Sequence, residues 1–225
     1  ILKIFDHFKK NKSFLTEHKN SRKATCFKKN NNTYSNKIYV EGYFESEKYF
    51  SSCKKELINE FTIKNELIEI NNKFINMLKN SNSISIHIRR NRFIEPKSFS
   101  VNPNQKKSSQ LKSEINLEDV FDYIFRSIRY YEKKIHNPKF FIWSNNFKDL
   151  DKFFDKRKFT FVENNSTLMD FYLFRFAKHF IVSPSTYHWW GAWLNSSDNK
   201  ICVRPSNNLN TSNNIDFWPE SWIKV

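Results

Sequence analysis

The chain has 225 residues, of which 39% are hydrophobic and 24 are phenylalanine, so it can build a packed core and is not a disordered chain. Its net charge of +15 favours anionic partners, such as nucleic acid, membrane surfaces or phosphorylated small molecules, although a bias toward Lys, Asn, Ile and Phe explains the charge equally well. A Walker loop and a GxGxxG fingerprint are excluded, because the chain has only two glycines.

The three cysteines, Cys26, Cys53 and Cys202, lie far apart and form no CxxC pair. They indicate neither a disulfide framework nor a zinc site, and they favour a reducing compartment. No apolar run of about 18 residues predicts a membrane span, and no signal-peptide pattern opens the chain. The sequence begins at Ile1 rather than Met, which suggests a fragment of a longer protein.

In the first third of the sequence, we predict only one short strand and two helices. Residues 1–37 are polar and rich in Lys and Asn, and residues 37–42 predict a short strand that ends at Gly42. The apolar spacing of residues 46–61 and 66–80 predicts two helices. We expect residues 1–79 to form a small, helix-rich part.

From residue 83 onward, predicted strands alternate with predicted helices. The strands are 83–88, 139–143, 159–162, 179–182 and 200–204, and the helices are 117–135, 147–156, 166–178 and 185–195. Several strands are continuous apolar runs, which is typical of a parallel sheet that is covered on both faces. We therefore predict a doubly wound α/β domain over residues 80–225.

Polar and charged residues follow four of these strands. Arg89 and Arg90 follow the first, Ser144, Asn145 and Asn146 the second, Glu163 and Asn164 the third, and Ser183, Ser185 and Thr186 the fourth. In open parallel sheets, ligands bind outside the carboxyl ends of the strands, so these groups are expected on one rim. Two arginines opposite a helix N-terminus can hold a phosphate or pyrophosphate.

Five segments of the chain match a known pattern in order and spacing from about residue 38 to the end. They are "GYFESEKYF" (42–50), "SIHIRR" (85–90), "FFIWSNN" (140–146), "LMDFYLFRFAKHFIVSPSTYHWWGAWLN" (168–195) and "FWPESWIKV" (217–225). Together they resemble the α-1,2-fucosyltransferases of glycosyltransferase family 11. The pairing of HxRR with SxxxWWGAWL is specific, whereas HxRR alone is not.

The resemblance implies a GT-B-like fold, with a Rossmann-like GDP-sugar-binding domain over 80–225 and a partial, acceptor-side domain over 1–79. It implies GDP-fucose as the donor, a galactose-ended glycan as the acceptor, and neither a metal nor another cofactor. Arg89 and Arg90 match the arginines that hold the donor pyrophosphate, and they are the predicted catalytic residues. The other predicted donor-binding residues are His87, Ser144, Asp170 as a partner of guanine or ribose, and Ser185 and Thr186 as phosphate ligands.

The implied reaction is an inverting transfer of fucose to the 2-hydroxyl of the galactoside. Fixed guanidinium groups stabilise the departing GDP as the bond to the sugar breaks, without a metal. A base takes the proton of the acceptor hydroxyl. Glu95 and His188 are candidates for this base, and we interpret both as bystanders; we also interpret His87 as a packed strand histidine that orients Arg89.

Two departures from the family pattern leave an alternative open. The Gly-rich "GGLGNQMFQYA" stretch of the family does not occur in this sequence, so we expect an N-terminally incomplete enzyme. The family's HxRRGD reads "HIRRNR" here, with Asn91 at the glycine and Arg92 at the aspartate. The alternative is a degenerate homologue that binds nucleotide or glycan without turnover, and a basic nucleic-acid-binding module is a third hypothesis.

Several other features have a structural interpretation. Trp189, Trp190 and Trp193 lie at helical spacing and are expected in the core. The "DLD" of residues 149–151 imitates a metal-binding motif, but it falls within the predicted helix 147–156. The Lys clusters are interpreted as solvated loops. We expect a role in bacterial surface polysaccharide, in the cytoplasm, with at most peripheral attachment to the membrane.

Overall fold

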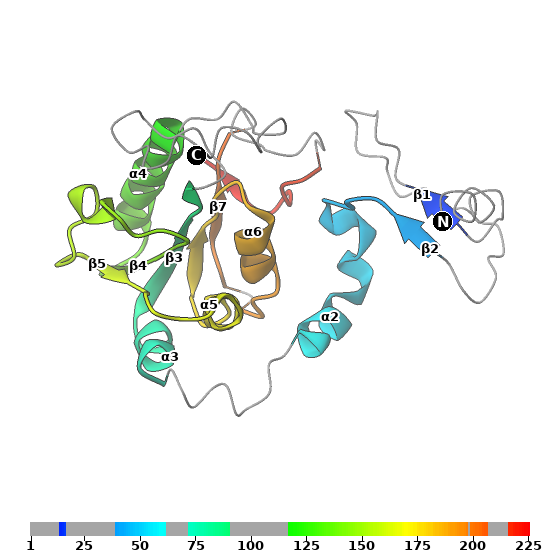
Figure 1. Ribbon diagram of the computed structural model, residues 1–225, viewed down its shortest axis with the longest axis horizontal. Helices are drawn as coiled ribbons and strands as arrows, with labels where there is room; N and C mark the ends of the chain where they lie inside the picture. The colour runs from blue at the N-terminus through cyan, green and yellow to red at the C-terminus, as the bar shows by residue number, and fades with distance from the viewer. Residues whose placement is uncertain (1–13, 17–38, 62–71, 91–116, 198, 207–215) are drawn as a thin grey trace. The chain divides into compact units, whose positions relative to one another are not determined.

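The computed structural model describes residues 14–16, 39–61, 72–90, 117–197, 199–206 and 216–225 (Figure 1). The chain divides into two compact units. The smaller comprises Ile1–Cys53 and Ser212–Pro219, and the larger comprises Lys54–Thr211 and Glu220–Val225.

A six-stranded sheet forms the centre of the larger unit, and every neighbouring pair of its strands is parallel. The strand order is β5-β4-β3-β6-β7-β8. The strands are β3 (Asn82–Ile88), β4 (Pro138–Ser144), β5 (Phe159–Phe161), β6 (His179–Ile181), β7 (Cys202–Arg204) and β8 (Ile223–Lys224). The chain runs outward from β3 to one edge and then returns to build the other edge from β6. The prediction of a doubly wound parallel sheet is therefore confirmed, with its switch point between β3 and β6.

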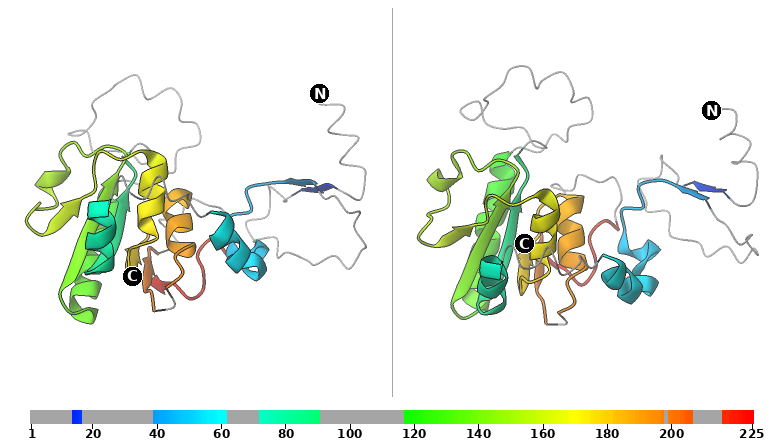
Figure 2. Two further views of the ribbon diagram at one scale, coloured as in Figure 1. Left: turned by 90° about the horizontal axis from the view of Figure 1, so that it is seen from below. Right: turned by 60° about the horizontal axis from the view of Figure 1, so that its bottom comes forward.

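Strand β3 is buried on both faces, with six consecutive buried residues from Ser83 to Ile88. Ile84, Ile86 and Ile88 pack into the core with the long helix α4 (Leu117–Lys134). His87 lies on the other face, against residues of the two helices α5 (Thr167–Phe174) and α6 (Thr186–Trp193). Figures 1 and 2 show α4 on one side of the sheet and α5 and α6 on the other.

Helix α4 is amphipathic in the way that its sequence predicts. Its buried residues recur at intervals of three and four positions, which places them on one face. They are Leu117, Val120, Phe121, Tyr123, Ile124, Ser127, Ile128 and Tyr131. Acidic side chains in its first turn and basic ones in its last complement the helix dipole.

Helices α5 and α6 lie very close together. A Cβ atom added to Gly191 would come within 2.6 Å of the side chain of Phe174. Trp189 and Trp193 of α6 are 3% and 2% exposed, so their interpretation as core residues is confirmed, whereas Trp190 is only partly buried.

The N-terminal elements are shorter than predicted. The expected helix over 46–61 consists of two single turns of 3-10 helix, η1 (Glu47–Tyr49) and η2 (Ser51–Cys53), followed by α2 (Lys54–Glu60). Within the predicted helix 66–80, the described part is α3 (Asn72–Lys79). A short parallel pair joins β1 (Phe14–Thr16) and β2 (Tyr39–Glu41) in the smaller unit. Helices α2 and α3 belong to the larger unit, and the division into functional domains at residues 79 and 80 stays a prediction.

The predicted helix over 147–156 is wrong. Only the single 3-10 turn η8 (Leu150–Lys152) forms there, and Asp149 before it has the left-handed backbone conformation, with φ of 61°. The apolar spacing is satisfied without a helix, because Leu150 and Phe154 are buried in the same core cluster as α4. Among the helices in the described ranges, none combines the length and apolar character needed to cross a membrane.

Candidate functional site

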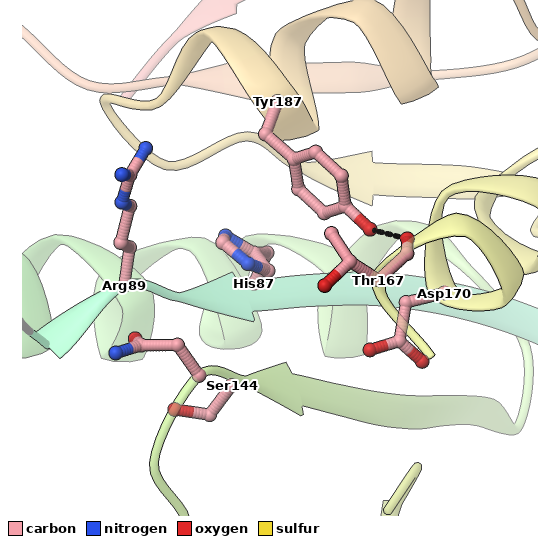
Figure 3. Close-up of a pocket in the computed structure, with 7 residues that line it drawn as sticks. His87, Arg89, Ser144, Thr167, Asp170 and Tyr187 are labelled. Atoms are coloured by element: carbon pink, nitrogen blue, oxygen red, sulfur yellow. Dashed lines mark hydrogen bonds between the residues drawn. The ribbon is translucent and has the colours of Figure 1, made fainter. Parts of the chain in front are cut away.

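A pocket of about 270 Å³ opens at the carboxyl edge of the sheet, close to the switch point (Figure 3). Its lining comes from the ends of β3 and β4 and from the first turns of α5 and α6. The lining residues are His87, Arg89, Ser144, Asn145, Thr167, Asp170 and Tyr187. Four of the seven predicted site residues therefore line one pocket: His87, Arg89, Ser144 and Asp170.

Arg89 supplies the positive charge of the pocket. It follows the last residue of β3, and alternation along the strand puts it on the same side of the sheet as His87. In Figure 3, Arg89 lies at one end of the pocket and Asp170 at the other, with His87 and Thr167 between them. The pocket is thus polarised, with a cation at one end and a carboxyl at the other.

His87 is packed into the wall of the pocket and is only 6% exposed. Its ring centroid lies 5.4 Å from that of Tyr187, 5.5 Å from that of His188 and 5.9 Å from that of Phe174. Burial, with a contribution from the Arg89 charge, lowers the pKa of His87 to about 3. The imidazole is therefore neutral at physiological pH, which agrees with its interpretation as a packed strand histidine; its orienting effect on Arg89 stays a prediction.

His188 lies behind His87 and is fully buried. Its Nε2 is 3.0 Å from Ser85 Oγ, and its Nδ1 is 3.5 Å from the backbone nitrogen of Ser183. Because Nδ1 accepts from that N–H, Nε2 carries the proton and donates to Ser85. Burial also lowers the pKa of His188 well below its usual range. His188 does not line the pocket, so its interpretation as a bystander in the chemistry fits its position.

Ser144 and Asn145 come from the carboxyl end of β4. The Ser144 hydroxyl lies 2.8 Å from the carbonyl oxygen of Ile88 and 2.9 Å from that of Asn146, so local backbone engages its proton. The side-chain oxygen of Asn145 accepts the backbone N–H of Arg90 at 2.8 Å. These bonds tie the loop after β4 to the end of β3.

Asp170 stands in the first turn of α5 and is partly buried. Burial raises its pKa to about 6, although a hydrogen bond from Asn165 Nδ2 at 3.1 Å acts in the opposite direction. Near neutral pH the carboxyl is mainly ionised but retains an elevated proton affinity. Such a group in a pocket is typical of a site that binds or transfers protons.

Tyr187 and Thr167 close the pocket beside Asp170. The Tyr187 hydroxyl donates to the backbone oxygen of Thr167, which links the start of α6 to the start of α5. Burial raises the pKa of Tyr187, with a further contribution from the Asp170 charge, so the phenol stays protonated. Neither residue was predicted from the sequence, although each stands in the first turn of a helix that follows a strand.

Arg90 does not line this pocket, although it was predicted beside Arg89. It is 2% exposed, and its guanidinium donates to the backbone oxygen of Lys148. Ser185 and Thr186 are also outside the lining. Ser185 is fully buried at the N-terminus of α6, where its hydroxyl has no hydrogen-bond partner among the described residues. The predicted binding roles of these three residues stay predictions.

The "DLD" segment has a local structural role. Asp149 pairs with Lys152 at 2.9 Å, and this interaction lowers the pKa of Asp149. In the described part of the chain, no three His, Cys, Asp or Glu side chains are placed to hold a metal ion together. Asn91, Arg92 and Glu95 lie outside the described residues.

The comparisons with known proteins agree on one family. Residues 3–224 match the family model described as glycosyl transferase family 11. The chain is 28% identical over 205 residues to an alpha-1,2-colitosyltransferase of Escherichia coli, covering 88% of this chain and 66% of that protein. It is also 28% identical over 191 residues to the O-antigen biosynthesis glycosyltransferase WbnK of Escherichia coli, covering 81% and 59%. The chain spans less than two thirds of each relative, and no solved structure matches it.

Proposed function

Because the chain belongs to glycosyl transferase family 11, we propose that it transfers fucose from GDP-fucose to the 2-hydroxyl of a terminal galactoside. The observation that carries the proposal is the pocket at the switch point, with Arg89 at one end and Asp170 at the other. A sugar nucleotide has the matching polarity, because its diphosphate is anionic and its base and ribose carry hydrogen-bond donors. Family membership favours this activity over the nucleic-acid-binding module.

The chemistry follows from the charge at the Arg89 end. The acceptor oxygen attacks the anomeric carbon, and the bond from that carbon to the diphosphate oxygen breaks with its electron pair going to GDP. The proton of the acceptor hydroxyl passes to a base. A guanidinium beside the diphosphate stabilises the growing negative charge, and this interaction strengthens as the bond breaks.

Asp170 supports binding of the guanosine part of the donor. Its carboxylate is a hydrogen-bond acceptor for N–H or ribose O–H groups, and it lies at the pocket end away from Arg89. The neighbouring Tyr187 ring offers an apolar surface beside it. The packing of His87 and Tyr187 reduces access of water to this side of the pocket.

The test is incubation of the purified chain with GDP-fucose and lactose. We expect release of GDP and a trisaccharide with fucose on the 2-position of galactose, and we expect Arg89→Ala to lower kcat/KM by about 100-fold or more. Saturable GDP binding without product under these conditions would support the degenerate homologue instead. Absence of both binding and product would overturn the proposal.

A second donor is a specific alternative, because one relative is named an alpha-1,2-colitosyltransferase. Parallel incubations with GDP-fucose and GDP-colitose distinguish the two donors by kcat/KM. A role in assembling bacterial surface polysaccharide is the corresponding expectation, since the other relative is named for O-antigen biosynthesis. The expected location in the cytoplasm stays a prediction.

A further inference from the structure

We propose that Asn145 binds the diphosphate of the sugar-nucleotide donor together with Arg89. This inference rests on the proposed function, since it names a further contact in the same pocket. Asn145 lines that pocket and is exposed, at the position directly after β4. The expected donor-binding set from the sequence did not include it.

The orientation of the Asn145 side chain is fixed by one hydrogen bond. Its Oδ1 accepts the backbone N–H of Arg90 at 2.8 Å. A backbone N–H needs an acceptor, so this bond identifies which end of the amide is oxygen and which is nitrogen. The amide nitrogen Nδ2, a donor of two hydrogen bonds, donates to no other described residue. Asn145 lines the pocket, so these N–H groups are available to a ligand that binds there.

The place of Asn145 points to the diphosphate rather than to the base. Ile88 of β3 pairs with Ser144 of β4 in the sheet register, so Arg89 and Asn145 are the next residues beyond two adjacent strand ends. Asp170 lies at the opposite end of the pocket from Arg89, and its carboxylate would repel a phosphate there. The anionic part of the donor consequently belongs at the end with Arg89, where Asn145 adds a directional, uncharged donor to the guanidinium charge.

The neighbouring Asn146 offers a matched control. Its Oδ1 also accepts a backbone N–H, that of Lys148 at 2.9 Å, and its side chain is also exposed. Asn146 does not line the pocket. Asparagine and aspartate are nearly isosteric, and an aspartate oxygen can accept the same backbone N–H. Asn145→Asp and Asn146→Asp therefore make the same chemical change, and both keep the local loop bond.

The experiment is calorimetric titration of the wild-type chain, Asn145→Asp, Asn145→Ala and Asn146→Asp with GDP. We expect Asn145→Asp to weaken GDP binding by about 10- to 100-fold, because it removes a donor to an anion and adds a negative charge beside it. Asn145→Ala removes the donor without adding charge, and we expect a loss of about 3- to 10-fold. Asn146→Asp is expected to bind GDP within about 2-fold of wild type.

The outcomes separate this inference from the proposed function. If the wild-type chain binds GDP and Asn145→Ala binds it equally well, the Asn145 contact is refuted while the proposed function stands. Equal losses from Asn145→Asp and Asn146→Asp would also refute it, since the effect would then be general electrostatics of the loop. No GDP binding by the wild-type chain would refute the proposed function and this inference with it. Asn145→Ala keeps the test decisive if Asn145→Asp does not fold.

Discussion

Arg89 and Arg90 are adjacent in sequence but meet different surroundings, because successive residues of an extended chain point to opposite sides. Arg89 continues the face of His87 and enters the pocket. Arg90 is buried and reaches the backbone of Lys148 in the loop that follows β4. Arg90 contacts the loop that begins with Asn145, so it supports one wall of the pocket.

Substitution of the two arginines is expected to separate binding from stability. Arg90→Ala removes a buried charged donor, so the backbone oxygen of Lys148 loses the hydrogen bond that it accepts from this guanidinium. We therefore expect the free energy of unfolding to fall by about 1 to 3 kcal/mol. Arg89→Ala is expected to change stability by about 0.5 kcal/mol or less and to abolish most GDP affinity. Urea denaturation and GDP titration of both variants measure this. If Arg90→Ala is as stable as wild type but no longer binds GDP, the stabilising role assigned to Arg90 is wrong.

Asp170 makes the stability of the chain depend on pH. Its folded-state pKa of about 6 lies above the ordinary value of 3.8, so the folded chain binds more protons than the unfolded chain between these values. Stability therefore falls as pH rises through this window, and the destabilisation is complete above pH 6. Asp170→Asn removes the ionisation and can retain the hydrogen bond from Asn165.

We therefore expect Asp170→Asn to be more stable than wild type at pH 7.5 by about 1 kcal/mol, a figure reduced for the solvent screening of a partly exposed carboxyl. At pH 3.5 the two chains should have nearly equal stability, because the carboxyl is protonated in the folded chain and mainly protonated in the unfolded chain. Urea denaturation at the two pH values measures the difference. A difference that is the same at both pH values would show that burial does not govern this carboxyl.

The site was predictable from the sequence where a residue's position decides its role. Arg89 and Ser144 come at the ends of strands, and the carboxyl-edge rule brings such residues together, whereas Asp170 was predicted from the family resemblance alone. Arg90 shows the limit of that rule, since one step along the backbone reverses the direction of a side chain. Asn145 was expected on this rim but not among the donor-binding residues, because the orientation of its amide depends on a hydrogen bond from Arg90, which follows a different strand.

Among the elements, the sequence predicted five of the six strands of the larger sheet, because buried parallel strands are continuous apolar runs. It missed β8 (Ile223–Lys224), whose two residues are exposed at the edge of the sheet. The segment 147–156 shows why the same reasoning failed for one helix. Phe147, Leu150, Phe153 and Phe154 have helical spacing, yet Phe153 and Phe154 pack on Phe121 of α4 from an irregular loop. The spacing of apolar residues indicates which side chains are buried together. A single 3-10 turn can bury side chains at this spacing as well as an α-helix can.

The contact between α5 and α6 explains the glycine in the WWGAW segment. A Cβ at Gly191 would meet three atoms of Phe174 at 2.6 to 3.0 Å, and neither helix can move without disturbing the pocket residues Asp170 and Tyr187. We expect Gly191→Ala to lower the free energy of unfolding by about 1 to 3 kcal/mol despite the better helix propensity of alanine. Thermal or urea denaturation measures the loss.

Gly42 supplies the control for this substitution. It is exposed, and its φ is not positive, so alanine fits its backbone without strain. Gly42→Ala is expected to change stability by about 0.5 kcal/mol or less. If Gly191→Ala is as stable as Gly42→Ala, the helix pair can separate freely and the close approach has no energetic importance.

For the chain as a whole, the amino-acid composition is compatible with several functions. The net charge of +15 fits a nucleotide, a nucleic acid or a membrane surface alike, and it does not choose among them. The family-specific segments and the polarised pocket favour a nucleotide-sugar site, because the pocket lining combines a cation, a carboxyl and aromatic side chains in one place. All residues of that lining belong to the larger unit, Lys54–Thr211 with Glu220–Val225.

This location predicts how GDP affects thermal unfolding. A ligand that binds only the folded state at 100 times its Kd stabilises by about 2.7 kcal/mol. For a chain of this size, that corresponds to a rise of roughly 5 to 10 °C in the unfolding temperature of the larger unit. Scanning calorimetry with and without GDP measures the shift, and Arg89→Ala at the same GDP concentration is expected to lose most of it. An equal shift in Arg89→Ala would place the nucleotide outside this pocket, because the substitution removes the positive end of the lining.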